Sequence, residues 1–209
     1  MRKHDTAIVN GSEFPDWMTP GELYRALDLE VQAYGFFESN TPGISTDLAA
    51  SITTHLAPNW LGPGGNYGED ALMADWHLLP QPCFLNPPYS RELNMPIEPW
   101  VEKLRDESAK GGFYFSLLPH RPDTRWWSLT KHAAEIREIP HRVKFVLPPE
   151  AFLARNARRI ASGLAPLTKT GGAGFPSALV VWHPQPGVIS PALPRRVTWD
   201  YLDRRKARS

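Results

Sequence analysis

The four residues Asn86-Pro87-Pro88-Tyr89 carry the clearest chemical signal in the sequence. The two prolines fix φ near about −65° and remove two backbone donors, which leaves the carbonyl oxygens of Asn86 and Pro87 able to accept hydrogen bonds. A residue before proline prefers extended geometry, so the turn is expected to project outward. Two acceptor oxygens followed by a flat ring suit an amino group on a planar ring that stacks on Tyr89. The alternative is an ordinary strand-to-loop turn, because Asn-Pro dipeptides are common in turns.

The elements that must position this turn alternate between helices and strands. Helices are expected at residues 20–33 and 97–109 and from 126 onward, and strands at 43–47, 83–86, 113–118, 135–139, 143–146 and 176–182. Such alternation predicts an α/β sandwich around a mainly parallel sheet. Ligands of these sheets bind at the carboxyl ends of the strands, which is where the turn at Asn86 follows its strand.

The composition is that of a globular domain with little net charge. The chain has 209 residues, of which 42% are hydrophobic and 22% charged, and its formal net charge is +1. A nucleic-acid surface must therefore arise from local segregation of charge. Cys83 is the only cysteine, which excludes an internal disulfide and a cysteine-based zinc site, and it is interpreted as a buried strand residue. No metal site is predicted.

Neither a membrane span nor a signal peptide is predicted. No apolar run approaches the ~20 residues that a membrane-spanning helix needs. No apolar segment follows the charged residues at the N-terminus. A cytoplasmic protein is therefore expected.

Two further segments could contact a ligand. Thr19-Pro20 indicates the start of the helix at 20–33, and a helix N-terminus suits a carboxylate ligand, although a simple cap is the alternative. Asp47 lies at the carboxyl edge of the strand at 43–47, followed by small residues that let a ligand approach the backbone. Asp47 fits a helix N-cap equally well.

The order of several motifs resembles the phage-type, Dam-like DNA N6-adenine methyltransferases. The motifs are Asp16-Trp17 with Thr19-Pro20, Asp47 with Ala49-Ala50-Ser51, Asp70 with Leu72 and Trp76, Asn86-Pro87-Pro88-Tyr89-Ser90, Leu117-Leu118-Pro119 with Arg121, Asp123-Thr124 and Trp126, Arg142 with Phe145, and Phe175-Pro176-Ser177. They cover about residues 14–182. Several spaced motifs in one order are more specific than the turn at Asn86 alone.

The resemblance implies a Rossmann-like class I methyltransferase fold, S-adenosyl-L-methionine as methyl donor, and adenine N6 in double-stranded DNA as acceptor. The catalytic residues would be Asn86, Pro87, Pro88 and Tyr89, which receive a base flipped out of the duplex. Asp47 would suit the ammonium or hydroxyl groups of the cofactor, and Asp70 its adenine amino group. No histidine is assigned as a base, because the proton can leave after transfer. The residues implied around the cofactor are Trp17, Thr19, Pro20, Asp47, Ala49, Ser51, Asp70 and Leu72.

The residues expected to contact DNA are basic. A cluster of arginines in residues 148–172 is interpreted as a reader of the groove or of phosphates, with a solvated helix face as the alternative. Arg121 could contact a phosphate or the cofactor, or pair with Asp123. The full set is Arg121, Arg142, Arg155, Arg158, Arg159 and Lys169.

The predicted organisation has three parts. An N-terminal arm (1–13) precedes a methyltransferase domain (14–185) with a basic insertion (148–172) as a candidate DNA-recognition element, and a basic C-terminal tail (186–209) follows. The resemblance implies a phage- or prophage-encoded enzyme in a bacterial host. Two alternatives stay open: methylation of another planar amino group, such as cytosine N4 or an amide in protein or RNA, and a DNA-binding module without catalysis. The recognition sequence and oligomeric state cannot be read from these motifs.

Overall fold

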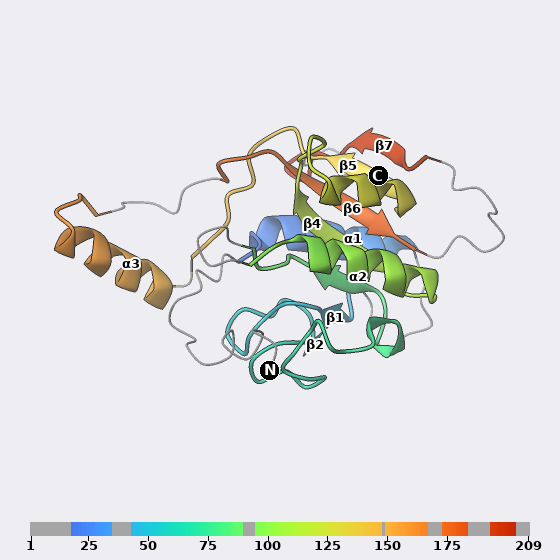
Figure 1. Cartoon of the computed structure of the whole chain (residues 1–209), viewed down its shortest axis with the longest axis horizontal. Coiled ribbons are helices and arrows are strands. Elements are labelled where there is room, and N and C mark those ends of the chain that lie inside the picture. Colours follow the sequence, from blue (N-terminus) through green and yellow to red (C-terminus); the bar gives the residue numbers. More distant parts are fainter. Residues whose placement is uncertain are drawn as a thin grey trace.

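The computed structural model describes residues 18–34, 43–89, 95–147, 149–166, 173–183 and 193–203. Within these ranges the chain forms a seven-stranded sheet with the order β2-β1-β3-β4-β6-β5-β7 (Figure 1). The strands are β1 (Thr46–Asp47), β2 (Asn59–Trp60), β3 (Cys83–Leu85), β4 (Tyr114–Pro119), β5 (Glu135–Glu138), β6 (Ser177–Trp182) and β7 (Arg195–Thr198). The chain is thus an α/β protein, as predicted.

The sheet is mixed. β2, β1, β3 and β4 run parallel to one another, and β7 runs parallel to β5. β6 is antiparallel to both β4 and β5, so it is the one reversed strand among those described. The expectation of a mainly parallel sheet holds, but the reversal of β6 was not predicted. All six residues of β6 are buried, and a continuous apolar run does not reveal the direction of its strand.

Helices cover both faces of the sheet (Figure 1). α1 (Gly21–Tyr34) buries Leu23, Leu27 and Val31 in one core together with Phe84 and Phe115. The opposite core holds side chains of α2 (Glu98–Ala109) and of two short 3-10 helices, η1 (Trp76–Leu78) and η2 (Trp126–His132). The helices expected at 20–33 and 97–109 are therefore confirmed. None of the described helices is long and apolar enough to cross a membrane.

One predicted strand is wrong, and two strands were missed. Residues 143–146 form no sheet strand; Val146 makes only an isolated bridge with Met18, and Val143 and Phe145 are buried against the α1 core. Their alternation therefore reflects packing rather than strand pairing. β2 lies within residues 56–68, where six Gly and Pro residues predict a loop, and it is only two residues long, too short to produce a periodic pattern.

β7 lies within the stretch predicted as a C-terminal tail. Its residues are mostly exposed, and Arg195 and Arg196 make ion pairs with Glu135 and Glu138 of β5. This strand is thus held in the sheet by ion pairs and backbone hydrogen bonds. It has no apolar face that packs on the core. The described part of the tail, residues 193–203, belongs to the fold. The limits of the predicted domains stay a prediction.

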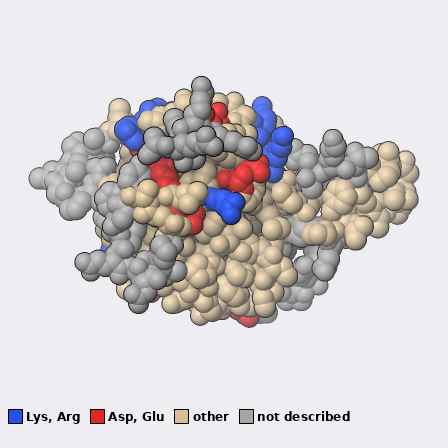
Figure 2. Space-filling model, turned by 180° about the vertical axis from the view of Figure 1, so that it is seen from behind, with Lys and Arg blue, Asp and Glu red and all other residues tan. Residues whose placement is uncertain are grey.

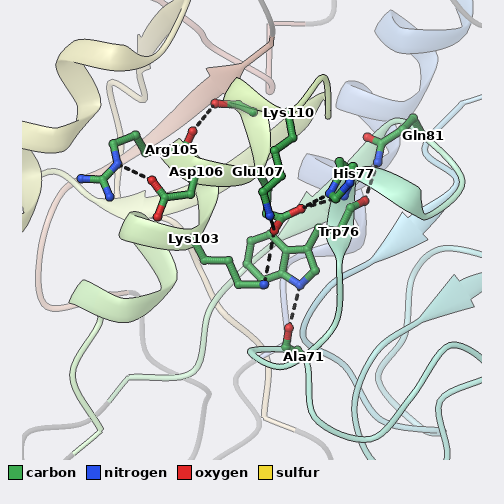
Figure 3. A network of polar contacts seen from close by, with 10 residues as sticks. Ala71, Trp76, His77, Gln81, Lys103, Arg105, Asp106, Glu107 and Lys110 are labelled. Atoms are coloured by element: carbon green, nitrogen blue, oxygen red, sulfur yellow. Dashed lines mark hydrogen bonds and ion pairs between the residues drawn. The ribbon is translucent and has the colours of Figure 1, made fainter.

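A buried carboxylate joins α2 to η1 (Figure 3). Glu107 accepts hydrogen bonds from the backbone N–H of His77 at 2.9 Å and from Lys110 at 2.9 Å, and it lies 2.7 Å from the ring of His77 and 3.5 Å from Lys103. Lys103 also lies over the ring of Trp76. Burial alone would raise the pKa of Glu107, but the bonds from Lys110 and His77 and the charge of Lys103 lower it to about 2.

Replacing Glu107 by Ala is expected to destabilise the protein by about 2–4 kcal/mol, because a buried donor and two lysines lose their partner. Because the pKa of Glu107 is lowered in the folded state, the difference from wild type should be full above pH of about 4.5 and shrink at lower pH. Urea unfolding at several pH values measures both effects.

Asp106→Ala is the matched control, since the neighbouring Asp106 is exposed and pairs only with Arg105 among the described contacts. Its cost should stay below about 1 kcal/mol, the usual contribution of a surface ion pair. Equal losses in the two variants would contradict a central role for Glu107.

Candidate functional site

The carboxyl ends of four parallel strands meet at one edge of the sheet. Asp47, the last residue of β1, lies opposite Trp60 of β2 and Phe84 of β3. Leu85 of β3 lies opposite Ser116 of β4, whose strand ends at Pro119. Asp47 ends β1, and Asn86 directly follows the neighbouring strand β3, although the two residues are far apart in the sequence. This edge brings together residues of both predicted sites, the catalytic and the cofactor site.

The Asn86 turn leaves the sheet at this edge. Its strand β3 is fully buried, and the backbone N–H of Leu48 donates to the carbonyl of Phe84 at 2.8 Å, which holds β3 against the loop after β1. Asn86 and Tyr89 are half-buried, Pro87 is buried and Pro88 is exposed. The turn therefore lies at the surface of the edge and not inside the core. The side-chain amide of Asn86 must be at the surface if it is to contact a ligand.

Tyr89 lies in an aromatic and basic environment. Its ring centroid is 6.0 Å from that of Phe175, which precedes β6. Burial raises the pKa of Tyr89, and the nearby charge of Arg121 opposes this shift. The hydroxyl therefore stays protonated, and the ring offers a neutral face. Among the described residues no ion pair joins Arg121 to Asp123, so that alternative for Arg121 has no support in the structure.

Asp47 is a buried carboxylate with two backbone donors. Its oxygens accept from the N–H groups of Ala49 at 3.4 Å and Leu56 at 3.2 Å, so it organises the loop that follows β1. Burial raises the pKa of Asp47 to about 6, although these two bonds and the nearby His55 work against the shift. The carboxylate is thus incompletely compensated, which suits an additional cationic or donor group.

Two loops pack together beside Asp47. The backbone N–H of Ala50 donates to the carbonyl of Leu61 at 3.0 Å. Gly62 has a φ of +129°, and a Cβ at this position would collide with the carbonyl oxygen of Ala50. Ser51 is tied to Thr54 through its hydroxyl and its backbone N–H. Ala49 and Ser51 are half-buried. The small residues that were expected to let a ligand approach the backbone therefore lie at the surface of the edge.

Asp70 and Leu72 lie in a turn on the α2 side of the sheet. Asp70 is exposed and accepts from the backbone N–H of Leu72 at 3.0 Å. Ala71 between them is buried in the same core as Leu48 and Leu61, which follow β1 and β2. The turn is therefore anchored near these strand ends. The carboxylate of Asp70 already has a local hydrogen-bond partner, so its position requires no ligand.

The start of α1 also belongs to this region. Thr19 and Pro20 are buried, and the carbonyl of Pro20 accepts from the N–H groups of Leu23 and Tyr24. Asp28, further along α1, accepts a hydrogen bond of 2.7 Å from the backbone N–H of Ile44, just before β1. Since the later part of α1 lies beside the start of β1, its N-terminus is directed toward the carboxyl edge.

Three side chains near Asp47 were not predicted. Tyr24 lies close enough that the charges of Asp28 and Asp47 add to the effect of burial in raising its pKa. His55 and Trp60 stack face to face, with ring centroids 4.1 Å apart and planes at 9°. The sequence places Tyr24 on the helix expected at 20–33 and assigns no site role to His55 or Trp60. The chain has eight tryptophans, many for its length, and this abundance is the one sequence signal that could have pointed to Trp60.

Trp60 tests whether this region could hold a cofactor. Its indole Nε1 is buried and has no hydrogen-bond partner among the described residues. A buried donor without a partner is costly, so a ligand acceptor at this place would be favourable. A buried, incompletely compensated carboxylate and a buried donor on neighbouring strands fit a ligand that carries both a cationic donor and an acceptor.

The predicted DNA-binding residues lie on different elements. Arg121 and Arg142 are exposed and follow β4 and β5, respectively. α3 (Pro149–Ala161) carries Arg158 and Arg159 in its last turn. This helix projects away from the sheet (Figure 1). Arg159 Nε also donates to the carbonyl of Ala165 at 2.9 Å, which closes the end of α3.

Some of the predicted residues cannot be compared with the structure. Trp17 and Lys169 lie outside the described residues. The position of Arg155 within α3 is described, but its side chain is not.

Two other features resemble sites but lie apart from the predicted residues. Asp75, His77 and Glu107 offer ligand atoms within 4.8 Å of one another. The oxygens of Glu107 are already bound by His77, Lys103 and Lys110, so this cluster serves the network of Figure 3. A hollow of about 510 Å³ follows the outer side of α1, and none of the predicted site residues is among those that line it.

The geometry defines an α/β protein with a candidate ligand site at the carboxyl edge of its parallel strands. A family model described as DNA N-6-adenine-methyltransferase (Dam) matches residues 10–164, well over half of the 209 residues. The chain belongs to this family, and it is an enzyme that methylates the N6 amino group of adenine in DNA. A comparison with curated proteins finds no match.

The raised pKa of Asp47 predicts a pH-dependent contribution to stability. Because the neutral carboxyl is favoured in the folded state, wild type should lose stability relative to Asp47→Asn as pH rises from about 4 to about 7. A shift from 3.8 to about 6 corresponds to about 3 kcal/mol. Urea unfolding of both proteins across this range provides the measurement. A difference that stays constant with pH would show that Asp47 is not desolvated in this way.

Proposed function

We propose that the protein transfers the methyl group of S-adenosyl-L-methionine to adenine N6 in double-stranded DNA, within a Rossmann-like class I methyltransferase sandwich. The observation that carries this proposal is the position of the Asn86 turn. It lies at the carboxyl edge, one strand away from Asp47, with Tyr89 and Phe175 beside it. This arrangement supports a base site and a cofactor site that share one edge.

The cofactor supplies a reactive methyl group on a positively charged sulfur. The protein's part is alignment. The side-chain oxygen of Asn86 and the carbonyl of Pro87 would accept the two amino hydrogens of adenine, which leaves the nitrogen lone pair free to take the methyl group. The sulfonium would leave as a neutral thioether, and the methylated nitrogen would then lose one proton to water. Tyr89 stacks on the base. Asp47, Trp60 and the start of α1 hold the cofactor at the other end of the edge.

The base must leave the duplex to reach this edge, which costs a few kcal/mol. Stacking on Tyr89 contributes about 1–3 kcal/mol toward that cost. Phe175 packs beside Tyr89 and keeps its ring oriented. Contacts between basic side chains and flanking phosphates supply the remainder.

The basic insertion begins and ends at the same edge. Ala173, just beyond it, donates its N–H to the carbonyl of Val143 at 2.8 Å, and Phe175 follows two residues later. By helical spacing, the positions of Arg155, Arg158 and Arg159 share one side of α3, while Leu153, Ala157 and Ile160 share the opposite side. We infer that the arginine side of α3 faces the DNA backbone.

Asn86→Ala is expected to lower the rate of methyl transfer at least about 10²-fold, the usual effect of removing one preorganised polar group from a reacting centre. Cofactor affinity should stay near wild type, because Asn86 contacts the base. Transfer from labelled S-adenosyl-L-methionine to DNA, RNA and protein substrates, with calorimetry for binding, measures both.

Gln32→Ala is the control, since it removes a carboxamide from the exposed side of α1 and should keep full activity. If Asn86→Ala keeps full activity, the proposed role of Asn86 in methyl transfer is contradicted. If the label appears only in RNA or only in protein, DNA is not the substrate.

Arg158→Ala should weaken duplex binding by a similar factor for all sequences. It should also reduce the slope of log affinity against log salt concentration by about 0.9, the value for one phosphate contact. Fluorescence anisotropy with a labelled duplex at several salt concentrations measures the slope. Arg105→Ala, on α2 and paired with Asp106, should leave it unchanged. A wild-type slope in Arg158→Ala would show that α3 does not contact the phosphates.

A further inference from the structure

The end of β1 and the end of β2 carry complementary polar groups. Asp47 and Trp60 are register partners on adjacent parallel strands, so their side chains leave the same face of the sheet. This is the face that α1 covers, because Tyr24 of α1 lies near Asp47. Asp47 is 4% exposed, and the indole nitrogen of Trp60 is buried without a partner among the described residues.

His55 keeps the indole in one orientation. Its imidazole lies flat on the Trp60 ring, and its Nδ1 is 3.0 Å from the carbonyl of Ala57. A carbonyl can only accept, so Nδ1 carries the hydrogen. Both residues are half-buried, so parts of the two rings lie at the surface of the edge, while the indole Nε1 itself is covered.

The chain segment around this pair, from Leu48 to Gly68, contains no Lys, Arg, Asp or Glu. Figure 2 shows the corresponding lower part of the back face to be almost free of charged side chains. Within this segment a charged ligand would find no counter-ion, and Asp47 directly precedes the segment. A ligand end that carries one positive and one negative group would be balanced by Asp47 and a neutral donor.

We propose that Asp47 and Trp60 together bind the amino-acid end of S-adenosyl-L-methionine. The ammonium group donates to Asp47, and the carboxylate accepts from the Nε1–H of Trp60. This assignment rests on the proposed cofactor and adds the orientation of its amino-acid end and a residue that selects for its carboxylate. The donor has already lost its water in the ligand-free protein, so the bond to a charged acceptor is strong.

Other buried polar atoms do not fit this role. Tyr114 begins β4 and lies at the opposite edge of the sheet. His120 follows β4, but its ring packs on Trp127 in the α2 core, on the other face from Asp47. Trp60 is the unpartnered donor that shares its face and strand register with the buried carboxylate.

The test compares two ligands that differ in one group. Affinities of wild type and Trp60→Phe are measured by calorimetry for S-adenosyl-L-methionine and for its decarboxylated analogue, S-adenosylmethioninamine. Trp60→Phe should bind S-adenosyl-L-methionine about tenfold or more weakly, the effect of one hydrogen bond to a charged group. It should bind the decarboxylated analogue as wild type does. Trp199→Phe, on the β7 side of the sheet, is the control and should change neither affinity.

The outcomes separate this proposal from the proposed function. An equal loss for both ligands would mean that Trp60 only supports the loop, and this would overturn the assignment. Unchanged affinity for S-adenosyl-L-methionine in Trp60→Phe would overturn it as well, while the cofactor itself would stand. Failure of the wild-type protein to bind S-adenosyl-L-methionine would instead overturn the proposed cofactor.

Discussion

The parallel pairing of β1 with β2 and β3 is the constraint on which the site depends. These strands are two or three residues long, so each has few backbone hydrogen bonds of its own. Cross-bonds between their loops, such as Leu48 N–H to Phe84 and Ala50 N–H to Leu61, extend the pairing beyond the strands. The same bonds bring Asp47 next to Asn86. A shift in register would place these side chains on opposite faces of the sheet.

Asp47 connects stability with function at this edge. A buried carboxylate with only two backbone donors is more costly than a neutral residue would be at neutral pH. The protein accepts this cost because the same carboxylate shapes the loop after β1 and, in the proposed complex, meets a cation. Glu107 shows the opposite arrangement. It is buried as well, but His77, Lys103 and Lys110 compensate it fully, and it serves only the fold.

Local pattern and chemistry predicted the parts of the structure that depend on short stretches of sequence. α1 and α2 follow helical spacing, β4 and β6 are long apolar runs, and the Asn86 turn is set by its own prolines. β2 and β7 depend instead on their partners, and the alternation at 143–146 reflects packing rather than pairing. The cluster of Tyr24, His55 and Trp60 around Asp47 could not be read in advance, because three separate segments meet there only in the folded chain.

The reversed strand β6 joins the two parts of the proposed DNA site. Because β6 is antiparallel to β4, its first residue Ser177 lies opposite Pro119, at the edge where β4 ends. A parallel strand in this place would begin at the far edge. The residues just before β6 therefore lie at the carboxyl edge, where Phe175 packs against Tyr89. In the proposed complex, the chain between the end of α3 at Ala161 and Phe175 joins the phosphate contact on α3 to the stacking face for the base, so the two parts of the DNA site belong to one continuous segment.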